Sequence, residues 1–254
     1  TGSSPFIPPV QGVDLKGVIS FRDIYDVNTM IKYCETKKNA VVIGGGLLGL
    51  EAAYGLKQRG MNVTVLHLMD RIMERQLDGR ASRMLRQSIE EKGINIITEA
   101  NTEALIDKNG HVKQVRLKDG TVLDADLVVF AVGIRPNIVL AQSAGLRCNR
   151  GILVNDTMQT FDPSIYAVGE CIEHRNQTFG LVEPLWGQAF ICATHLAEHG
   201  SLTFKSPTVP TQLKVSGVDV FSAGNFEPKE DYEDIILNDE KRQIYKRIII
   251  QKDK

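Results

Sequence analysis

The stretch that decides the fold is "NAVVIGGGLLGLEA", residues 39–52. An apolar run leads directly into three glycines, and a segment with helical spacing follows. Gly44, Gly46 and Gly49 form G-x-G-x-x-G where a buried strand ends and a helix begins. In that context the glycines permit a tight turn, the approach of a pyrophosphate and close packing of helix on sheet. We predict a dinucleotide site on this loop; the alternative is a tight turn that binds nothing.

The segments around the glycine loop alternate between two patterns. Short β-branched apolar runs predict buried strands, and apolar residues three and four apart predict helices. This alternation indicates a parallel sheet with right-handed crossovers. The sequence therefore predicts an α/β, Rossmann-like fold. The strands are expected at 40–43, 62–66, 94–98 and 127–132, and the helices at 23–37, 47–59, 79–92 and 184–199.

Other stretches are predicted to be strand-rich or irregular. Asp119-Gly120 lies between alternating segments and predicts a hairpin, so a β-meander is expected as an insert in the nucleotide-binding domain. Residues 1–20 are rich in Gly, Pro and Ser and are predicted to be loop. A strand is expected at 165–168. The last strand, within 242–254, has no evident partner.

Composition excludes several classes of protein. The chain has 254 residues, a net charge of −1, 43 % apolar and 24 % charged residues, which indicates one or two globular domains. We expect no nucleic-acid partner, because the balance of charge gives no basic face. The sequence shows neither a membrane span nor a signal peptide, and the four scattered cysteines form no C-x-x-C. We therefore expect a cytoplasmic protein without a metal or iron–sulfur site of its own.

The residue that reads the ribose should lie about 20 residues after the glycine loop, at the end of the second strand. His67 occupies this position. An acid there would hold both ribose hydroxyls and exclude a 2′-phosphate, whereas histidine does neither decisively. Arg71 and Arg75 follow; they are either phosphate ligands or solvated helix charges. The sequence therefore permits both NADH and NADPH.

A second nucleotide signature, "TFDPSIYAVGE", occupies residues 160–170 and ends in Gly-acid. With "AVGIRPN" at 131–137 and the opening "TGS", it resembles the FAD- and NAD(P)-dependent flavoprotein reductases of the pyridine-nucleotide-disulfide-oxidoreductase family. Within that family, "GGGLLGLEAA", "HLMDRIMERQLD", "GLVEPLWGQA" and "LKVSGVDVFSAG" are similar to the large subunits of assimilatory NAD(P)H nitrite reductases. The resemblance covers nearly the whole chain.

The resemblance implies two sets of cofactor-binding residues. We expect no catalytic acid or base and no metal ligand, because the cofactors carry the chemistry. The set for NAD(P)H is Gly44, Gly45, Gly46, Leu47, Leu48, Gly49, Glu51, His67, Val132 and Gly133. The set for FAD is Thr1, Gly2, Arg135, Gly169, Glu170, Pro184, Leu185 and Trp186.

The resemblance also implies a domain order. Residues 1–20 match a remnant of an FAD-binding domain, 21–137 an NAD(P)-binding domain, 138–205 the second part of the FAD-binding domain, and 206–254 the truncated start of a C-terminal domain. The family's first FAD-binding glycine loop is missing, as is the region that holds sirohaem and an iron–sulfur cluster. We therefore expect an internal piece of a larger enzyme that is inactive alone.

The implied function is electron input. Hydride would pass from NAD(P)H to FAD, and electrons would continue to a metal centre that reduces nitrite to ammonia. One alternative is an NADH-dependent flavin reductase of rubredoxin or ferredoxin; another is a dinucleotide-binding module without turnover. The expected partners are the dinucleotide and the remaining domains or a small subunit of the reductase, and a homodimer is also open.

Weaker motifs leave alternatives open. His195, Glu198 and His199 spell H-x-x-E-H, which is a zinc-peptidase signature or, as we favour, the end of an exposed helix. Cys171 is a redox thiol or, as we favour, a small buried residue. Trp186 is a core aromatic or, if the resemblance decides, a flavin neighbour.

Overall fold

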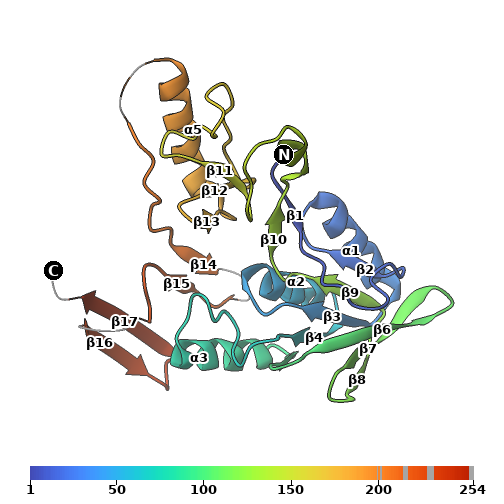
Figure 1. Ribbon diagram of the computed structural model, residues 1–254. Helices are drawn as coiled ribbons and strands as arrows, with labels where there is room; N and C mark the ends of the chain where they lie inside the picture. Colours follow the sequence, from blue (N-terminus) through green and yellow to red (C-terminus); the bar gives the residue numbers. More distant parts are fainter. Residues whose placement is uncertain (199, 201, 214–216, 228–231, 252–254) are drawn as a thin grey trace. The chain divides into compact units, whose positions relative to one another are not determined.

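The computed structural model describes residues 1–198, 200, 202–213, 217–227 and 232–251 (Figure 1). The chain divides into two compact units. The glycine-loop unit comprises Ile7–Val132 and Pro210–Lys254, and the Glu170 unit comprises Thr1–Phe6 and Gly133–Val209.

A five-stranded parallel sheet forms the centre of the glycine-loop unit (Figure 1). Its order is β2-β9-β3-β4-β5, and every neighbouring pair is parallel. Four of its five strands are the apolar runs predicted to be buried, as expected for strands covered on both faces. The strands are β2 (Val18–Ser20), β9 (Leu127–Phe130), β3 (Asn39–Ile43), β4 (Asn62–Leu66) and β5 (Ile94–Ile97).

The two faces of this sheet carry different layers. Ala40 and Val42 of β3 share a core with the helices α1 (Ile24–Thr36), α2 (Leu47–Gln58) and α3 (Gly79–Glu90). Val41 and Ile43 face a second core beneath an antiparallel meander. The alternation arises because successive side chains of a strand point to opposite faces. The meander consists of β6 (Thr102–Lys108), β7 (His111–Leu117) and β8 (Val122–Asp124).

The C-terminal part of the glycine-loop unit forms two short antiparallel pairs. β14 (Thr211–Leu213) pairs with β15 (Val220–Ser222), and Leu213 joins the core that contains the helices. β16 (Tyr232–Asp239) pairs with β17 (Ile244–Gln251). The last strand was predicted to lack a partner. That prediction is wrong, because β17 pairs with β16 along its length; the acidic residues Glu233 and Asp234 interrupt the apolar pattern of β16 in the sequence.

The Glu170 unit is a small α/β arrangement with its own core. β1 (Ser3–Pro5) pairs with β10 (Ile134–Pro136), and β12 (Ile172–His174) lies between β11 (Ile152–Val154) and β13 (Gln177–Thr178). The helices are α4 (Val139–Ser143) and α5 (Val182–Leu196). Met158 and Ile172 are fully buried in this core.

The α/β Rossmann-like fold class is confirmed, with three local corrections. Within residues 1–20, predicted as loop, Ser3–Pro5 forms β1 and Val18–Ser20 forms the edge strand β2. Residues 165–168, predicted as a strand, contain only an isolated bridge between Tyr166 and Gln159. Helix α5 ends at Leu196 instead of 199, because Glu198 adopts a left-handed backbone with φ of 57°.

Candidate functional site

The glycine loop connects β3 to α2, and two of its glycines are required by packing. A Cβ on Gly44 would lie 2.3 Å from the carbonyl oxygen of Ala131, and its φ of 123° disfavours other residues. A Cβ on Gly49 would lie 1.8 Å from the carbonyl oxygen of Gly44. These two glycines bring the helix and β9 close to the loop.

Gly46 differs from its neighbours because nothing in the fold requires it to be glycine. Its φ of −86° is ordinary, and a Cβ placed on it would meet no atom within 4 Å. Gly46 is also the N-cap of α2, and no side chain caps this helix end. The backbone N–H groups of the first turn are thus left for an external acceptor, which suits an anion. The open space is the one that the pyrophosphate of a dinucleotide needs.

The first turns of α2 carry three more predicted contacts. Leu47 packs against the helical core, whereas Leu48 is 45 % exposed beside the loop. Burial raises the pKa of Glu51 above its ordinary value. Val132 lies at the end of the glycine-loop unit, and its amide nitrogen would lie 3.3 Å from a Cβ on Gly44. The loop, Leu48, Glu51 and Val132 are therefore neighbouring parts of one unit.

Gly133, predicted for the same site, belongs to the Glu170 unit. Its carbonyl oxygen accepts a hydrogen bond from the amide of Phe6. Its φ of 105° explains the glycine by backbone conformation alone.

The surroundings of His67 differ from those expected of a residue that binds the ribose. It is 9 % exposed, and its Nδ1 accepts a hydrogen bond of 3.0 Å from the amide of Gly45. Its Nε2 lies 3.0 Å from Oε2 of Glu74. Both ring nitrogens are therefore engaged within the protein.

The two arginines after β4 make surface ion pairs. Arg71 Nη2 donates to Oε1 of Glu227 at 2.6 Å, and its Nη1 lies 3.9 Å from Asp70. The Arg75 side chain is 86 % exposed, with its Nε 3.9 Å from Glu74. Arg75 therefore matches the solvated charge that the sequence left open, while Arg71 is already paired.

In the Glu170 unit, the Gly-acid motif meets the N-terminal segment. Ser3 Oγ donates to Oε2 of Glu170 at 2.5 Å. The amide of Gly169 donates to Oε1 of Gln188 on α5 at 2.8 Å. Ser3 and Gln188 were not predicted, although both lie in the motifs that carry the resemblance. The structure adds them to the candidate site around Glu170.

The predicted residues Thr1, Gly2 and Arg135 lie on the paired strands β1 and β10 or beside them. Asn137 binds the carbonyl oxygen of Thr1 through Nδ2 at 2.7 Å, and its amide binds that of Gly2 at 2.9 Å. The guanidinium of Arg135 lies 4.0 Å from the centre of the Phe6 ring. Asn137 therefore helps to fix the N-terminal segment of this unit, together with the pairing of β1 and β10.

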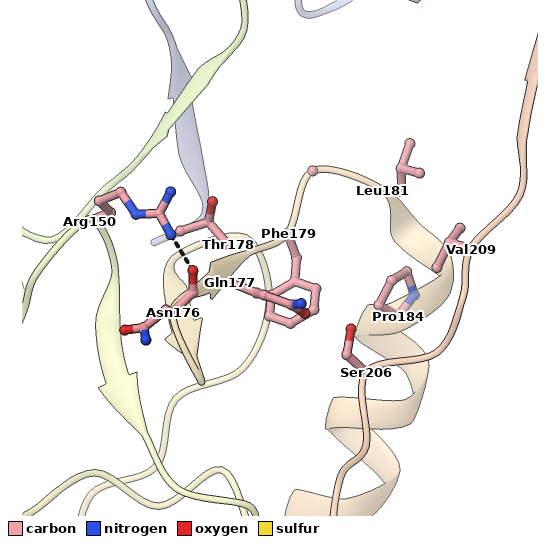
Figure 2. A pocket seen from close by; sticks show the side chains of 10 residues that line it. Arg150, Asn176, Gln177, Thr178, Phe179, Leu181, Pro184, Ser206 and Val209 are labelled. Atoms are coloured by element: carbon pink, nitrogen blue, oxygen red, sulfur yellow. Dashed lines mark hydrogen bonds between the residues drawn. The ribbon is translucent and has the colours of Figure 1, made fainter. Parts of the chain in front are cut away.

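The N-terminal end of α5 lines an open pocket of about 380 Å³ (Figure 2). Pro184 of α5 is buried at the wall, while Arg150 and Asn176 come from the segments around β11 and β12 (Figure 2). Leu185 packs against the core of this unit. Trp186 is 73 % exposed, so it is not a core aromatic.

Two features test whether this unit fits a flavin nucleotide. Gln188 is fully buried, and its Nε2 lacks a hydrogen-bond partner in the described structure. Gly169 has a φ of 101° and open space where a Cβ would lie. A buried donor without an acceptor beside an accessible backbone and a carboxylate fits a ligand with many hydroxyl and carbonyl oxygens. The residues present therefore fit the ribityl part of FAD.

The weaker motifs find structural explanations. His195 Nδ1 lies 2.8 Å from the hydroxyl of Tyr166, and His199 lies outside the described residues. Within the described ranges, no cluster of side chains is suited to a metal ion. Cys171 is a buried free cysteine, and its Sγ lies 3.4 Å from the carbonyl oxygen of Val168. In the same ranges, no helix is long and apolar enough to cross a membrane.

Two family models match the chain. Residues 1–189 match the pyridine nucleotide-disulphide oxidoreductases, and residues 210–254 match the rubredoxin NAD⁺ reductase C-terminal domain. The second match lies on the C-terminal strands described above, where a further domain was predicted to begin.

Curated proteins and solved structures give concordant relatives. A nitrite reductase [NAD(P)H] of Bacillus subtilis (strain 168) is 51 % identical over 99 % of this chain and 31 % of its own length. The assimilatory nitrate reductase electron transfer subunit of the same organism is 44 % identical over 100 % of this chain and 33 % of its own length. The structure of an NAD-dependent persulfide reductase from A. fulgidus aligns with a TM-score of 0.88 and 28 % identity, covering 99 % of this chain and 50 % of that one.

The chain thus spans about a third of the length of these curated relatives. The resemblance predicted from the motifs is confirmed by the family model and by the relatives. The chain belongs to the pyridine nucleotide-disulphide oxidoreductase family.

Proposed function

We propose that the glycine-loop unit binds NAD(P)H on the residues from Gly44 to Gly49. The observation that carries the proposal is the open space at Gly46, together with the uncapped first turn of α2. Leu48, Glu51 and Val132 border the loop and would contact the rest of the dinucleotide. His67 would support the loop from within the protein instead of contacting the dinucleotide, because both of its ring nitrogens are engaged.

The Glu170 unit would hold the ribityl part of FAD. Glu170 would accept hydrogen bonds from the hydroxyls, and Gln188 would give its unpartnered Nε2 to an oxygen of the cofactor. Gly169 leaves room for that approach, and Pro184, Leu185 and Trp186 lie on the neighbouring helix. Thr1, Gly2 and Arg135 belong to the same unit. A bound flavin supplies the ability to accept a hydride and to release electrons one at a time.

We assign the parent protein to electron input for nitrite reduction. The similarity to nitrite reductase [NAD(P)H] over 99 % of this chain supports the assignment. The side chains position cofactors, and a sirohaem and an iron–sulfur cluster would reside in other parts of the parent. The proposed domain order is the predicted one: 1–20 and 138–205 for FAD, 21–137 for NAD(P)H and 206–254 for the start of a further domain.

A second candidate is a reductase of a small redox protein. The match of residues 210–254 to the rubredoxin NAD⁺ reductase C-terminal domain favours it. The two candidates share the input steps and differ in the acceptor. NADH-dependent reduction of nitrite, measured against reduction of rubredoxin with the full-length parent, distinguishes them.

The proposed partners follow from the same assignment. They are the dinucleotide and the remaining domains or a small subunit of the reductase, and we place the protein in the cytoplasm. The outward face of the β16–β17 hairpin carries Ile235, Leu237 and Ile248, which are 60 %, 55 % and 61 % exposed. Such a face favours association, so a homodimer is part of the proposal.

The dinucleotide site is tested with two matched glycine variants. Gly46→Val fills the space that the pyrophosphate would occupy, whereas Gly55→Val fills open space further along α2. We expect Gly46→Val to abolish NADH binding in titration calorimetry and Gly55→Val to leave it unchanged. Equal affinity of both variants for NADH would refute the assignment of the loop.

A further inference from the structure

We propose that His67 and Glu74 are positioning residues for the glycine loop, and that protonation of His67 releases the loop and weakens dinucleotide binding. This inference rests on the proposed binding of NAD(P)H at that loop. It assigns to His67 a role other than contact with the ribose, and it brings in Glu74, which lies in the motif at 67–78 but was not predicted as a site residue.

The hydrogen bonds fix the tautomer of His67. The amide of Gly45 is always a donor, so Nδ1, 3.0 Å away, must present a lone pair. The ring proton is then on Nε2, which donates to Oε2 of Glu74 at 3.0 Å. His67 in this geometry is the neutral Nε2–H form.

The segment 72–74, which contributes Glu74, also contacts Gly45 directly. The amide of Met73 donates to the carbonyl oxygen of Gly45 at 3.0 Å. A Cβ on Gly45 would lie 2.9 Å from both Cγ of His67 and Cγ2 of Ile72. The N–H of Gly45 is therefore held by His67 and its C=O by Met73. Gly45 directly precedes Gly46, the residue proposed to face the dinucleotide.

The surroundings of the ring decide what protonation does. Among the described residues, Glu74 is the charged group in contact with it, and Arg75 lies 3.9 Å from Glu74. On the β5 side the contacts are backbone ones, with Ile97 accepting from the amide of His67 and Ala100 donating to its carbonyl. Glu99 on that segment is exposed.

A proton on Nδ1 would place two N–H groups against each other. Glu74 attracts the imidazolium, while the Gly45 amide repels it, so the ring stays with Glu74 and leaves the loop. Dinucleotide affinity should therefore fall when His67 is protonated.

Two substitutions at His67 distinguish its hydrogen bond with Gly45 from its hydrogen bond with Glu74. In His67→Asn, Oδ1 replaces Nδ1 as acceptor for Gly45 but cannot titrate. In His67→Gln, the amide reaches toward Glu74 and leaves the Gly45 amide without its acceptor. We expect NAD⁺ affinity of the wild-type chain, measured by calorimetry, to fall about three- to tenfold between pH 8 and pH 5.5, the effect of losing one hydrogen bond.

His67→Asn should keep the affinity seen at the higher pH and show no such fall, and His67→Gln should bind weakly at both pH values. Glu74→Gln removes the carboxylate that attracts the imidazolium, so its pH profile should differ from that of the wild type. A purely structural role for His67 would not move the pH profile. Far-ultraviolet circular dichroism at both pH values confirms that each variant is folded.

The outcomes separate the inference from the function on which it rests. The same fall in affinity in His67→Asn as in the wild type, or wild-type binding by His67→Gln, would overturn the inference. If Gly46→Val also bound NAD⁺ normally, the dinucleotide site itself would be misplaced. Should His67→Gln fail to fold, the profiles of His67→Asn and Glu74→Gln still decide the question.

Discussion

Arg247 on the last strand donates through Nη1 to Oδ2 of Asp78, the N-cap of helix α3, at 3.1 Å. The hydroxyl of Tyr245 donates to the same oxygen at 2.7 Å. The other oxygen, Oδ1, accepts from the amides of Arg80 and Ala81. One carboxylate thus both caps a helix of the parallel-sheet layer and anchors the β16–β17 hairpin, so the two features depend on each other.

Replacing Asp78 should therefore have a larger effect than loss of a helix cap alone. Removal of an N-cap side chain costs about 0.5–2 kcal/mol. Asp78→Ala should exceed this cost and also free the hairpin, whereas Asp23→Ala removes the cap of α1 without touching the hairpin. Chemical denaturation measures the first effect and limited proteolysis within 232–251 the second. Equal rates of cleavage in the two variants would contradict the anchoring role.

The anchor should hold within a window of pH. Burial alone raises the pKa of Asp78, but hydrogen bonds from Ala81, Tyr245 and Arg247 outweigh it and hold that pKa below its ordinary value. Its contribution to stability is therefore present above the unfolded pKa and is lost as the pH falls through the folded one.

The alkaline edge of that window belongs to Tyr245. Burial, followed by the hydrogen bond to Asp78, raises the pKa of Tyr245 to about 12. The stabilisation is complete below the unfolded pKa of about 10 and is lost as the pH rises through the folded value. The difference in ultraviolet titration between the wild type and Tyr245→Phe isolates this group. We expect its midpoint to decrease in Asp78→Asn; an unchanged midpoint would show that the hydrogen bond contributes little.

The choice between NADH and NADPH should depend on Arg71 and its partner. His67 offers neither a carboxylate to exclude a 2′-phosphate nor a cation to bind one, so we expect a modest NADH preference, within about 1–2 kcal/mol. Glu227→Gln removes the partner of Arg71 and should raise NADPH affinity about two- to fivefold, in the range of a surface ion pair. Glu240→Gln, which frees Arg80, is the matched control. A tenfold NADPH preference in the wild type would show that Arg71 or Arg75 already binds the phosphate.

The 254-residue chain by itself should retain FAD poorly. Its sequence has a single G-x-G-x-x-G, and that loop belongs to the glycine-loop unit. A hydrogen bond to a charged group such as Glu170 contributes about 1.5–3 kcal/mol, while association costs several kcal/mol of lost freedom. Flavin absorbance of the purified chain measures the retention. A chain that purifies with stoichiometric FAD would show that Glu170, Ser3 and Gln188 form a more complete site.

The parts of the fold that the sequence predicts best are those where one local pattern dominates. β3, the glycine loop, α2 and β4 combine apolar runs, a loop motif and helical spacing, and each agrees with the structure. β2 was not predicted because it has only three residues within a Gly- and Pro-rich stretch. Its partner β9 lies far away in the sequence. A pairing between strands so distant in the sequence produces no periodic pattern from which either strand could be predicted.

The candidate site divides in the same way. Gly46 could be predicted from the loop motif in its strand–helix context, and Glu170 from the motif that carries the family resemblance. Glu74 and Gln188 were missed because their roles depend on partners in other elements, His67 and Gly169. A polar residue on a helix or turn is usually solvated, so residue type alone gave no reason to select them.

The engaged amides before Gly46 give the glycine loop a boundary that amide hydrogen exchange would detect. The amide of Gly44 donates to the carbonyl oxygen of Leu66, and that of Gly45 donates to His67, so both exchange only after local opening. The amides of Leu47 and Leu48 belong to the first helical turn and have no intrahelical acceptor. Slow exchange therefore changes to fast exchange within a few residues. A bound anion would also slow the exchange of the first amides of α2, so the newly protected amides would show where the anion binds.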